Sequence, residues 1–96
     1  MVDPTKGWDH LWKQPDVITS GWDRPSSVVV DLAEQLFVAG ARRALDLGCG
    51  PGRHTVALAH AGYQVAATDV SPTGLAHCRD WLASLGLRAT LAEADM

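Results

Sequence analysis

The fold is decided by residues 41–69, ARRALDLGCGPGRHTVALAHAGYQVAATD. An apolar run at 44–47 predicts a strand, and a glycine-rich turn at 48–52 follows it directly. A helical pattern covers 53–61, and a second apolar run then leads to Asp69. The order of strand, tight turn, helix, strand and acid predicts one βαβ unit that carries a nucleotide-binding site.

Each residue type in this unit suits such a site. Gly48 and Gly50 lack a Cβ, so the turn can adopt positive φ and a ligand can approach the backbone closely. The turn opens a helix whose free N–H groups favour electron-rich ligand atoms. Asp69 ends the second strand beside the turn, where a carboxylate can accept two hydrogen bonds from a ribose diol.

The spacing of the glycines separates two kinds of nucleotide site. A dinucleotide fingerprint requires glycine at position 53, which is Arg53 here. This difference argues against an NAD-dependent oxidoreductase half and against FAD. An ordinary strand-to-helix connection without a ligand is the bland alternative for any isolated glycine-rich turn, but the flanking strand, helix and acid favour a site.

The segment resembles the class I S-adenosylmethionine (SAM)-dependent methyltransferases. LDLGCGPG at 45–52 is similar to their first motif, and TDVS at 68–71 is similar to their second, which carries the ribose-binding acid. The resemblance covers residues 41 to 96. It implies an α/β fold, a Rossmann-like three-layer αβα arrangement with helices on both faces and parallel strands in the order 3-2-1. It also implies SAM as cofactor and S-adenosylhomocysteine as product.

The family pattern also implies roles at the glycine-rich turn. Gly48, Cys49 and Gly50 would cradle the methionine and sugar through backbone groups. Asp46 would support the turn and help to hold the methionine amino group through water, or would cap the turn only. Arg53 would either contact the methionine carboxylate or be solvated.

The ribose and adenine are assigned to the next two strand ends. By resemblance Asp69 binds the ribose hydroxyls and Val70 packs on the adenine, whereas Asp95 and Met96 recognise the adenine amino group and ring. Glu93 is the alternative to Asp95 as the adenine-binding acid. No catalytic residue and no metal ligand is identified.

Residues 1–24 are expected to be a Trp-rich segment ahead of a truncated SAM-binding domain at 25–96. Trp8 and Trp12 are four residues apart and share one face of a short predicted helix. They either cover the core or form a lid over the cofactor, and Trp22 is expected to be buried against the same helix. His10 either faces the methyl group or lies on the surface.

The remaining pattern predicts helices at 25–39 and from Pro72 to just before Gly86, and a third strand at 87–92. Ser26 or Ser27 and Ser71 are the expected N-caps. The first of these helices is expected to pack on the sheet. The apolar stripe of the first helix consists of Val28, Leu32 and Leu36 and is broadened by Val29, Ala33 and Phe37. The buried stripe of the second consists of Leu75, Cys78, Leu82 and Leu85.

Composition limits the class of protein. The formal net charge is −3, from 8 basic and 11 acidic residues, and no basic block is present, so a nucleic-acid partner is not expected and a small-molecule methyl acceptor is favoured. No apolar run is long enough to span a membrane, and residues 1–4 lack the pattern of a signal peptide, so a cytoplasmic protein is expected. Cys49 and Cys78 suggest neither a disulfide framework nor a metal site.

By resemblance, a complete fold of this family has about seven strands, and the fourth pairs with the first. Residues 1–96 hold three predicted strands, so the first would expose an unpaired edge, which is a template for pairing with another chain. We therefore expect the cofactor-binding half of a small-molecule methyltransferase, joined to a missing C-terminal half or assembled as a homo-oligomer. A non-catalytic fragment or association module that self-associates through the open edge is the alternative.

Overall fold

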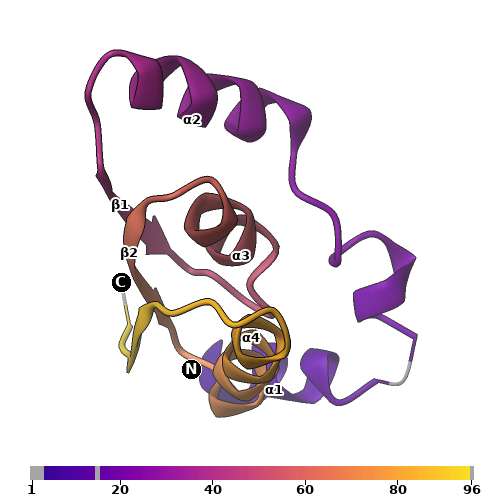
Figure 1. Cartoon of the computed structure of the whole chain (residues 1–96). Coiled ribbons are helices and arrows are strands. Elements are labelled where there is room, and N and C mark those ends of the chain that lie inside the picture. The colour runs from indigo at the N-terminus through magenta and orange to yellow at the C-terminus, as the bar shows by residue number, and fades with distance from the viewer. Residues whose placement is uncertain (1–3, 15, 96) are drawn as a thin grey trace.

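The computed structural model describes residues 4–14 and 16–95. Its elements follow in the order α1 (Pro4–Trp12), the 3₁₀ helix η1 (Ile18–Ser20), α2 (Ser27–Val38), β1 (Arg43–Leu47), α3 (Arg53–His60), β2 (Gln64–Asp69), α4 (Pro72–Ser84) and β3 (Thr90–Glu93) (Figure 1). Within these residues no helix combines the length and the apolar character that crossing a membrane would need.

The three strands form one parallel sheet in the order β1-β2-β3. Leu45 of β1 is paired with Ala66 of β2, and Ala67 of β2 is paired with Leu91 of β3. The βαβ unit at 41–69 is therefore confirmed, as are the α/β class and the predicted 3-2-1 order, which is the same sheet counted from the other edge.

Helices cover one face of this sheet. The helices α3 and α4 both pack on that face, with α1 against α4 and α2 against α3 (Figure 1). Helices on both faces were expected, but two right-handed crossovers that step in the same direction place their helices on the same side. On the opposite face Leu45 and Leu47 are 64% and 58% exposed, because no described residue covers them.

The core lies between β2 and the helices α3 and α4. Val56 and Ala59 of α3 and Val65 of β2 are buried in it. The predicted stripe of α4 is confirmed at Leu75, Cys78 and Leu82, which are all buried. Leu85 is instead half exposed, because the helix ends before it.

The C-terminal end of α4 also delays the third strand. Gly86 has a φ of 67°, and the Leu87 N–H donates to the Leu82 carbonyl, so these residues close the helix end. The strand expected at 87–92 is therefore observed at Thr90–Glu93.

The stripe predicted for α2 is wrong for its central residues and right for two of the residues that broaden it. Val28, Leu32 and Leu36 are 71%, 52% and 48% exposed. The predicted residues Ala33 and Phe37 do face the core, where they lie toward α3 and Tyr63, whose hydroxyl donates to the Ala33 carbonyl. The helix α2 therefore packs on a helix rather than on the sheet, and its apolar stripe remains uncovered among the described residues.

The start of α2 is held by a histidine of α3. Ser26 is the N-cap, but its side chain makes no capping hydrogen bond; its backbone N–H donates to His54 Nε2 at 3.0 Å. Burial lowers the pKa of His54, and the neighbouring Arg53 lowers it further, whereas Asp46 opposes the shift. The ring is therefore neutral at pH 7, with Nε2 free to accept.

A folded-state pKa below the unfolded value of about 6.5 means that the unfolded chain binds the proton more readily. The stability that His54 contributes is therefore complete above that value and is lost as the pH falls below it. We expect His54→Gln to flatten the pH dependence of the free energy of unfolding between about pH 7.5 and 5.5. Urea unfolding at several pH values measures this, with His60→Gln as the control on the same helix. Equal slopes for His54→Gln and the wild type would contradict this role.

The glycine-rich turn approaches α4 closely at Gly52, which is the N-cap of α3 and has a φ of 102°. A Cβ at this position would lie 2.4 Å from Cys78 Sγ and 3.2 Å from Cys78 Cα. The turn therefore reaches α4 only because this residue is glycine. Gly40 also has a positive φ, of 111°, but a Cβ there would meet no atom within 4 Å.

These two glycines separate backbone strain from steric overlap. We expect Gly40→Ala to lower the free energy of unfolding by about 1–2 kcal/mol, the cost of left-handed backbone in a residue with a Cβ. Gly52→Ala should cost roughly 2–5 kcal/mol, because overlap with Cys78 adds to that strain. Denaturant unfolding measures both values, and similar losses for the two variants would show that the close approach to α4 is relaxed at little cost.

Candidate functional site

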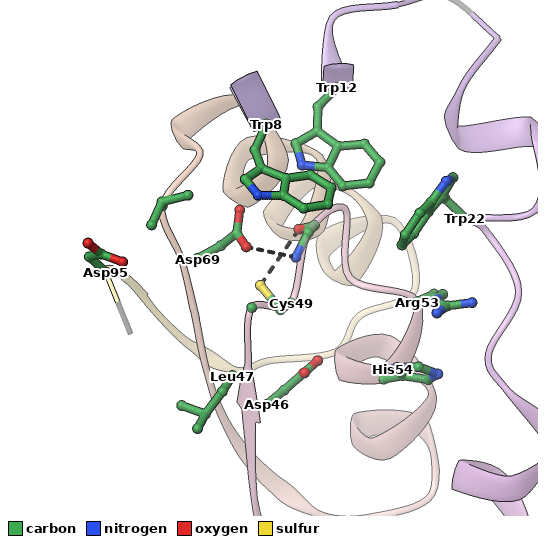
Figure 2. A pocket seen from close by; sticks show the side chains of 13 residues that line it. Trp8, Trp12, Trp22, Asp46, Leu47, Cys49, Arg53, His54, Asp69 and Asp95 are labelled. Carbon is green, nitrogen blue, oxygen red and sulfur yellow. Dashed lines mark hydrogen bonds between the residues drawn. The ribbon is translucent and has the colours of Figure 1, made fainter. Parts of the chain in front are cut away.

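A cavity of about 330 Å³ opens at the carboxyl ends of the strands, under α1. Strand ends, the glycine-rich turn, the start of α3 and the N-terminal segment all contribute to it (Figure 2). Its lining consists of Trp8, Trp12, Trp22, Asp46, Leu47, Gly48, Cys49, Gly50, Arg53, His54, Asp69, Val70 and Asp95. Every described residue assigned to cofactor binding from the sequence is in this set, and Met96 lies outside the described residues.

Asp69 joins the glycine-rich turn to the start of α4. Its Oδ1 accepts the Gly50 N–H at 3.3 Å, and its Oδ2 accepts the Ser71 N–H at 3.1 Å. The side chain is buried yet faces the cavity from the end of β2 (Figure 2). A carboxylate has about four acceptor positions, so two remain for a ligand.

Asp46 is anchored by a neighbour that the sequence did not reveal. Its Oδ2 accepts the Thr55 hydroxyl at 2.7 Å, and Thr55 is completely buried in α3. This bond ties the end of β1 to the helix that follows the turn, whereas capping of the turn by Asp46 stays a prediction. The same residue also lines the cavity.

Cys49 lies inside the turn as a buried thiol. Its backbone N–H donates to the Thr68 carbonyl at 2.9 Å, and its Sγ lies 3.6 Å from the Gly50 carbonyl. Hydrogen bonding with Cys78 and burial raise the pKa of Cys49, so the sulfur is protonated at neutral pH. Its place in the site is therefore that of a compact apolar group beside the backbone.

Val70 and Asp95 flank the far end of the cavity. Val70 follows β2 directly and is half buried, whereas Asp95 follows β3 and is exposed. Glu93, the alternative acid, is paired with Asp69 in the sheet register and does not line the cavity.

Tryptophans form the opposite wall. Trp8 and Trp12 are stacked with ring centroids 5.9 Å apart, and Trp22 meets Trp12 edge-on at 5.1 Å. Trp22 therefore packs against the first helix, but it is 36% exposed, so its predicted burial is wrong. The guanidinium of Arg53 lies over the Trp22 ring at 4.9 Å. Trp12 is only 2% exposed, whereas Trp8 is 46% exposed above the cavity (Figure 2). Trp12 therefore covers the core, and Trp8 forms part of the cavity wall.

Asp9 is a further polar residue that the sequence did not single out. Its Oδ1 accepts both the Ser71 hydroxyl and the Thr73 N–H at 2.8 Å, and its Oδ2 pairs with Lys13 at 3.0 Å. Hydrogen bonds from Thr73, then Lys13 and Ser71, hold the pKa of Asp9 well below its usual range. One sequence signal was available: the first turn of α4 contains no acidic residue, so its free N–H groups need an acceptor from elsewhere.

Two expectations about histidine and metal chemistry concern this region. His10 is exposed, forms a hydrogen bond with Gln14 Nε2 at 3.1 Å and does not line the cavity, in agreement with the surface alternative. In residues 4–14 and 16–95, no group of three His, Cys, Asp or Glu residues is arranged to hold a metal ion.

Comparison with known proteins assigns the family. The model of a family described as "Methyltransferase domain" matches residues 44–96, which is more than half of the chain. No curated relative matches the sequence.

Several solved structures share the fold. One comes from work on the conversion of a disulfide bond into a thioacetal group during echinomycin biosynthesis; it is 30% identical, with a TM-score of 0.78, over 97% of this chain and 40% of that one. TehB from Haemophilus influenzae is 27% identical, with a TM-score of 0.67, and the match covers 83% of this chain and 28% of TehB. A third structure is the 16S rRNA N2 G1207 methyltransferase RsmC from T. thermophilus in complex with AdoMet and guanosine. It is 28% identical, with a TM-score of 0.62, and the match covers 75% of this chain and 20% of RsmC.

The chain thus spans less than half the length of these three structures. Three observations point to the same family: the matched family model, the parallel sheet in the order 3-2-1, and the glycine-rich turn beside an acid at the end of β2. The chain belongs to the class I SAM-dependent methyltransferase family, whose cofactor is S-adenosylmethionine.

Proposed function

We propose that this chain is the cofactor-binding half of a SAM-dependent methyltransferase and that it holds SAM in the cavity at the carboxyl ends of β1, β2 and β3. The observation that carries this function is the arrangement of Asp69, which fixes the turn through Gly50 and keeps acceptor positions toward the cavity. In parallel α/β sheets, ligands bind outside the carboxyl ends of the strands.

The residues of the cavity suit the parts of the cofactor. Asp69 accepts the ribose hydroxyls, and the backbone of 48–50 lies against the methionine and sugar. Asp46, held by Thr55, faces the methionine amino group. Val70 and Asp95 lie on the adenine side, and the role assigned to Met96 rests on the family pattern alone.

The charges of the cavity fit a cationic ligand. Three carboxylates, Asp46, Asp69 and Asp95, line it together with one guanidinium, Arg53. SAM carries a sulfonium and an ammonium group, which such a site attracts, and one carboxylate, which Arg53 can meet at the start of α3. When bound, SAM supplies an activated methyl group, and the contribution of the protein to methyl transfer is mainly to hold donor and acceptor close and in line.

The acceptor that we propose is a small molecule rather than a nucleic acid. The net charge of −3 and the lack of a basic block support this choice, since RNA binding requires a positive surface. The 30%-identical structure comes from work on echinomycin biosynthesis, although RsmC acts on 16S rRNA. We assign residues 1–24 as a lid over residues 25–96, with the exposed face of Trp8 on the acceptor side of the cavity.

Calorimetric titration of S-adenosylhomocysteine into the chain tests the site. We expect one-to-one binding that Asp69→Asn weakens by about tenfold or more, because charge-assisted hydrogen bonds to the ribose are lost. Asparagine is preferred to alanine because it keeps the size of the side chain and one of the two oxygen acceptors of the Gly50 and Ser71 N–H groups, whereas alanine would remove both.

Asp31→Asn, an exposed acid on α2, is the matched control and should bind like the wild type. Equal affinities for Asp69→Asn and the wild type would remove the ribose assignment. Binding of NAD in place of S-adenosylhomocysteine would indicate an oxidoreductase half.

An association module is the second candidate, and a specific surface favours it. In the described residues, β1 is an edge strand that pairs with β2 alone, and Leu45 and Leu47 are exposed on the open face. The uncovered stripe of Leu32 and Leu36 on α2 adds to this apolar surface. Parallel sheets are normally covered on both faces, so this surface suits either the remaining half of the domain or a second copy of the chain.

Sedimentation velocity at micromolar concentration tests self-association. We expect the wild-type chain to form oligomers and the double variant Leu45→Lys/Leu47→Lys to shift toward the monomer, because two charges would have to be buried in the interface. Gln64→Lys is the control, since it adds a charge on the same sheet face without removing apolar surface. A well-folded wild-type monomer would exclude self-association through this surface.

A further inference from the structure

The helix α1 is attached to the cofactor side of the domain by two separate contacts. The first is steric: the Trp12 ring fills a notch between the glycine-rich turn and the first turn of α4. A Cβ at Gly50 would lie 2.9 Å from Trp12 Cζ2, and a Cβ at Gly74 would lie 2.9 Å from Trp12 Cδ1. The ring therefore fits only because both positions are glycine.

The second contact is polar and lies three residues earlier in the same helix. Asp9 receives the Ser71 hydroxyl and the Thr73 N–H, so a carboxylate of α1 completes the N-terminus of α4. Charge-assisted bonds of this kind are among the stronger hydrogen bonds in proteins. Asp9 also lies at the positive end of the α4 dipole.

Ser71 connects this contact to the cavity. Its hydroxyl donates to Asp9 and accepts the Gly74 N–H at 3.0 Å, while its backbone N–H donates to Asp69. Asp69 in turn holds the Gly50 N–H. One continuous chain of hydrogen bonds thus runs from α1 through Ser71 to Asp69 and the glycine-rich turn, and Ser71 is completely buried at its centre.

We propose that Asp9 is a positioning residue that couples the docking of α1 to the cofactor carboxylate Asp69, given the SAM site proposed above. Docked α1 holds Ser71 in the orientation that fixes Asp69, and it places Trp8 above the cavity (Figure 2). A cofactor bound to Asp69 stabilises the same arrangement. By linkage, cofactor binding and docking of α1 strengthen each other by the same factor.

Two variants disturb the two contacts independently. Asp9→Asn keeps the size of the side chain but removes its charge. Gly74→Ala places a methyl group 2.9 Å from Trp12 Cδ1 and 3.2 Å from the Gly50 carbonyl, although alanine is the better helix former within α4. Exchange in α1 is therefore the primary readout for this variant. A loss of α1 docking in Gly74→Ala would therefore not be explained by unfolding of α4. Asp16→Asn, on the exposed segment after α1, is the matched control.

The experiment combines hydrogen exchange of the amides of residues 4–14 with titration of S-adenosylhomocysteine, for the wild type and the three variants. We expect Asp9→Asn and Gly74→Ala to exchange faster in α1 without ligand and to bind S-adenosylhomocysteine about tenfold more weakly, within the usual range of coupling between sites. In the wild type and Asp16→Asn, the ligand should slow exchange in α1. In Asp9→Asn the ligand should slow this exchange less than in the wild type, and that difference is a readout that a purely structural role of Asp9 would not produce.

The outcomes separate the coupling from the site itself. Two results would overturn the coupling and leave the cofactor site intact. In the first, the wild type and Asp9→Asn bind S-adenosylhomocysteine with the same affinity. In the second, the wild type binds the ligand but exchange in α1 does not become slower. Absence of binding by the wild type would overturn the proposed site and the coupling together. Circular dichroism of each variant identifies any loss of affinity that reflects global unfolding, and Gly74→Ala then decides the question if Asp9→Asn fails to fold.

Discussion

The buried carboxylate of Asp69 is the group on which the site depends. It is the common acceptor for one N–H of the glycine-rich turn and one N–H before α4, so two strand-to-helix connections are fixed to each other by one side chain. A buried carboxylate needs such donors, because its desolvation would otherwise be costly. The positions of Gly50 and Ser71, and through Ser71 the position of α1, therefore follow from this residue.

The site lies at the carboxyl edge of a sheet that helices cover on one face only. Both crossovers place their helices on the same face, which completes the cavity above the strand ends while leaving Leu45 and Leu47 exposed on the other face. The proposed cofactor site and the proposed association surface are therefore largely separate and meet at Leu47, which lines the cavity and is exposed on the open face. The proposed cofactor site lies at the carboxyl ends of the strands, and the open face with the edge of β1 carries exposed apolar surface of a kind that parallel sheets normally cover.

Sequence patterns predicted local features well and the packing partners of helices poorly. The apolar stripe of α2 predicted a buried face that includes Leu32 and Leu36, but both residues are exposed. Periodicity shows which side of a helix is apolar, but it does not show which element covers that side. Likewise the expected second helical layer followed from the resemblance, whereas the handedness of two successive crossovers decided the side on which α3 and α4 lie. The stripe of α4 was predicted correctly at Leu75, Cys78 and Leu82, because its neighbours, β2 and β3, are adjacent in the chain.

The sequence by itself determined the βαβ unit, the glycine-rich turn and the acids at 46, 69 and 95, because the ends of consecutive parallel strands must meet at one edge of a sheet. Only the tertiary structure decided that Thr55 holds Asp46, that His54 anchors Ser26 and that Asp9 completes the start of α4. Asp9 and Ser71 are 62 positions apart. No local periodicity encodes such a contact, since it depends on where the packed core places the two helices that carry the side chains.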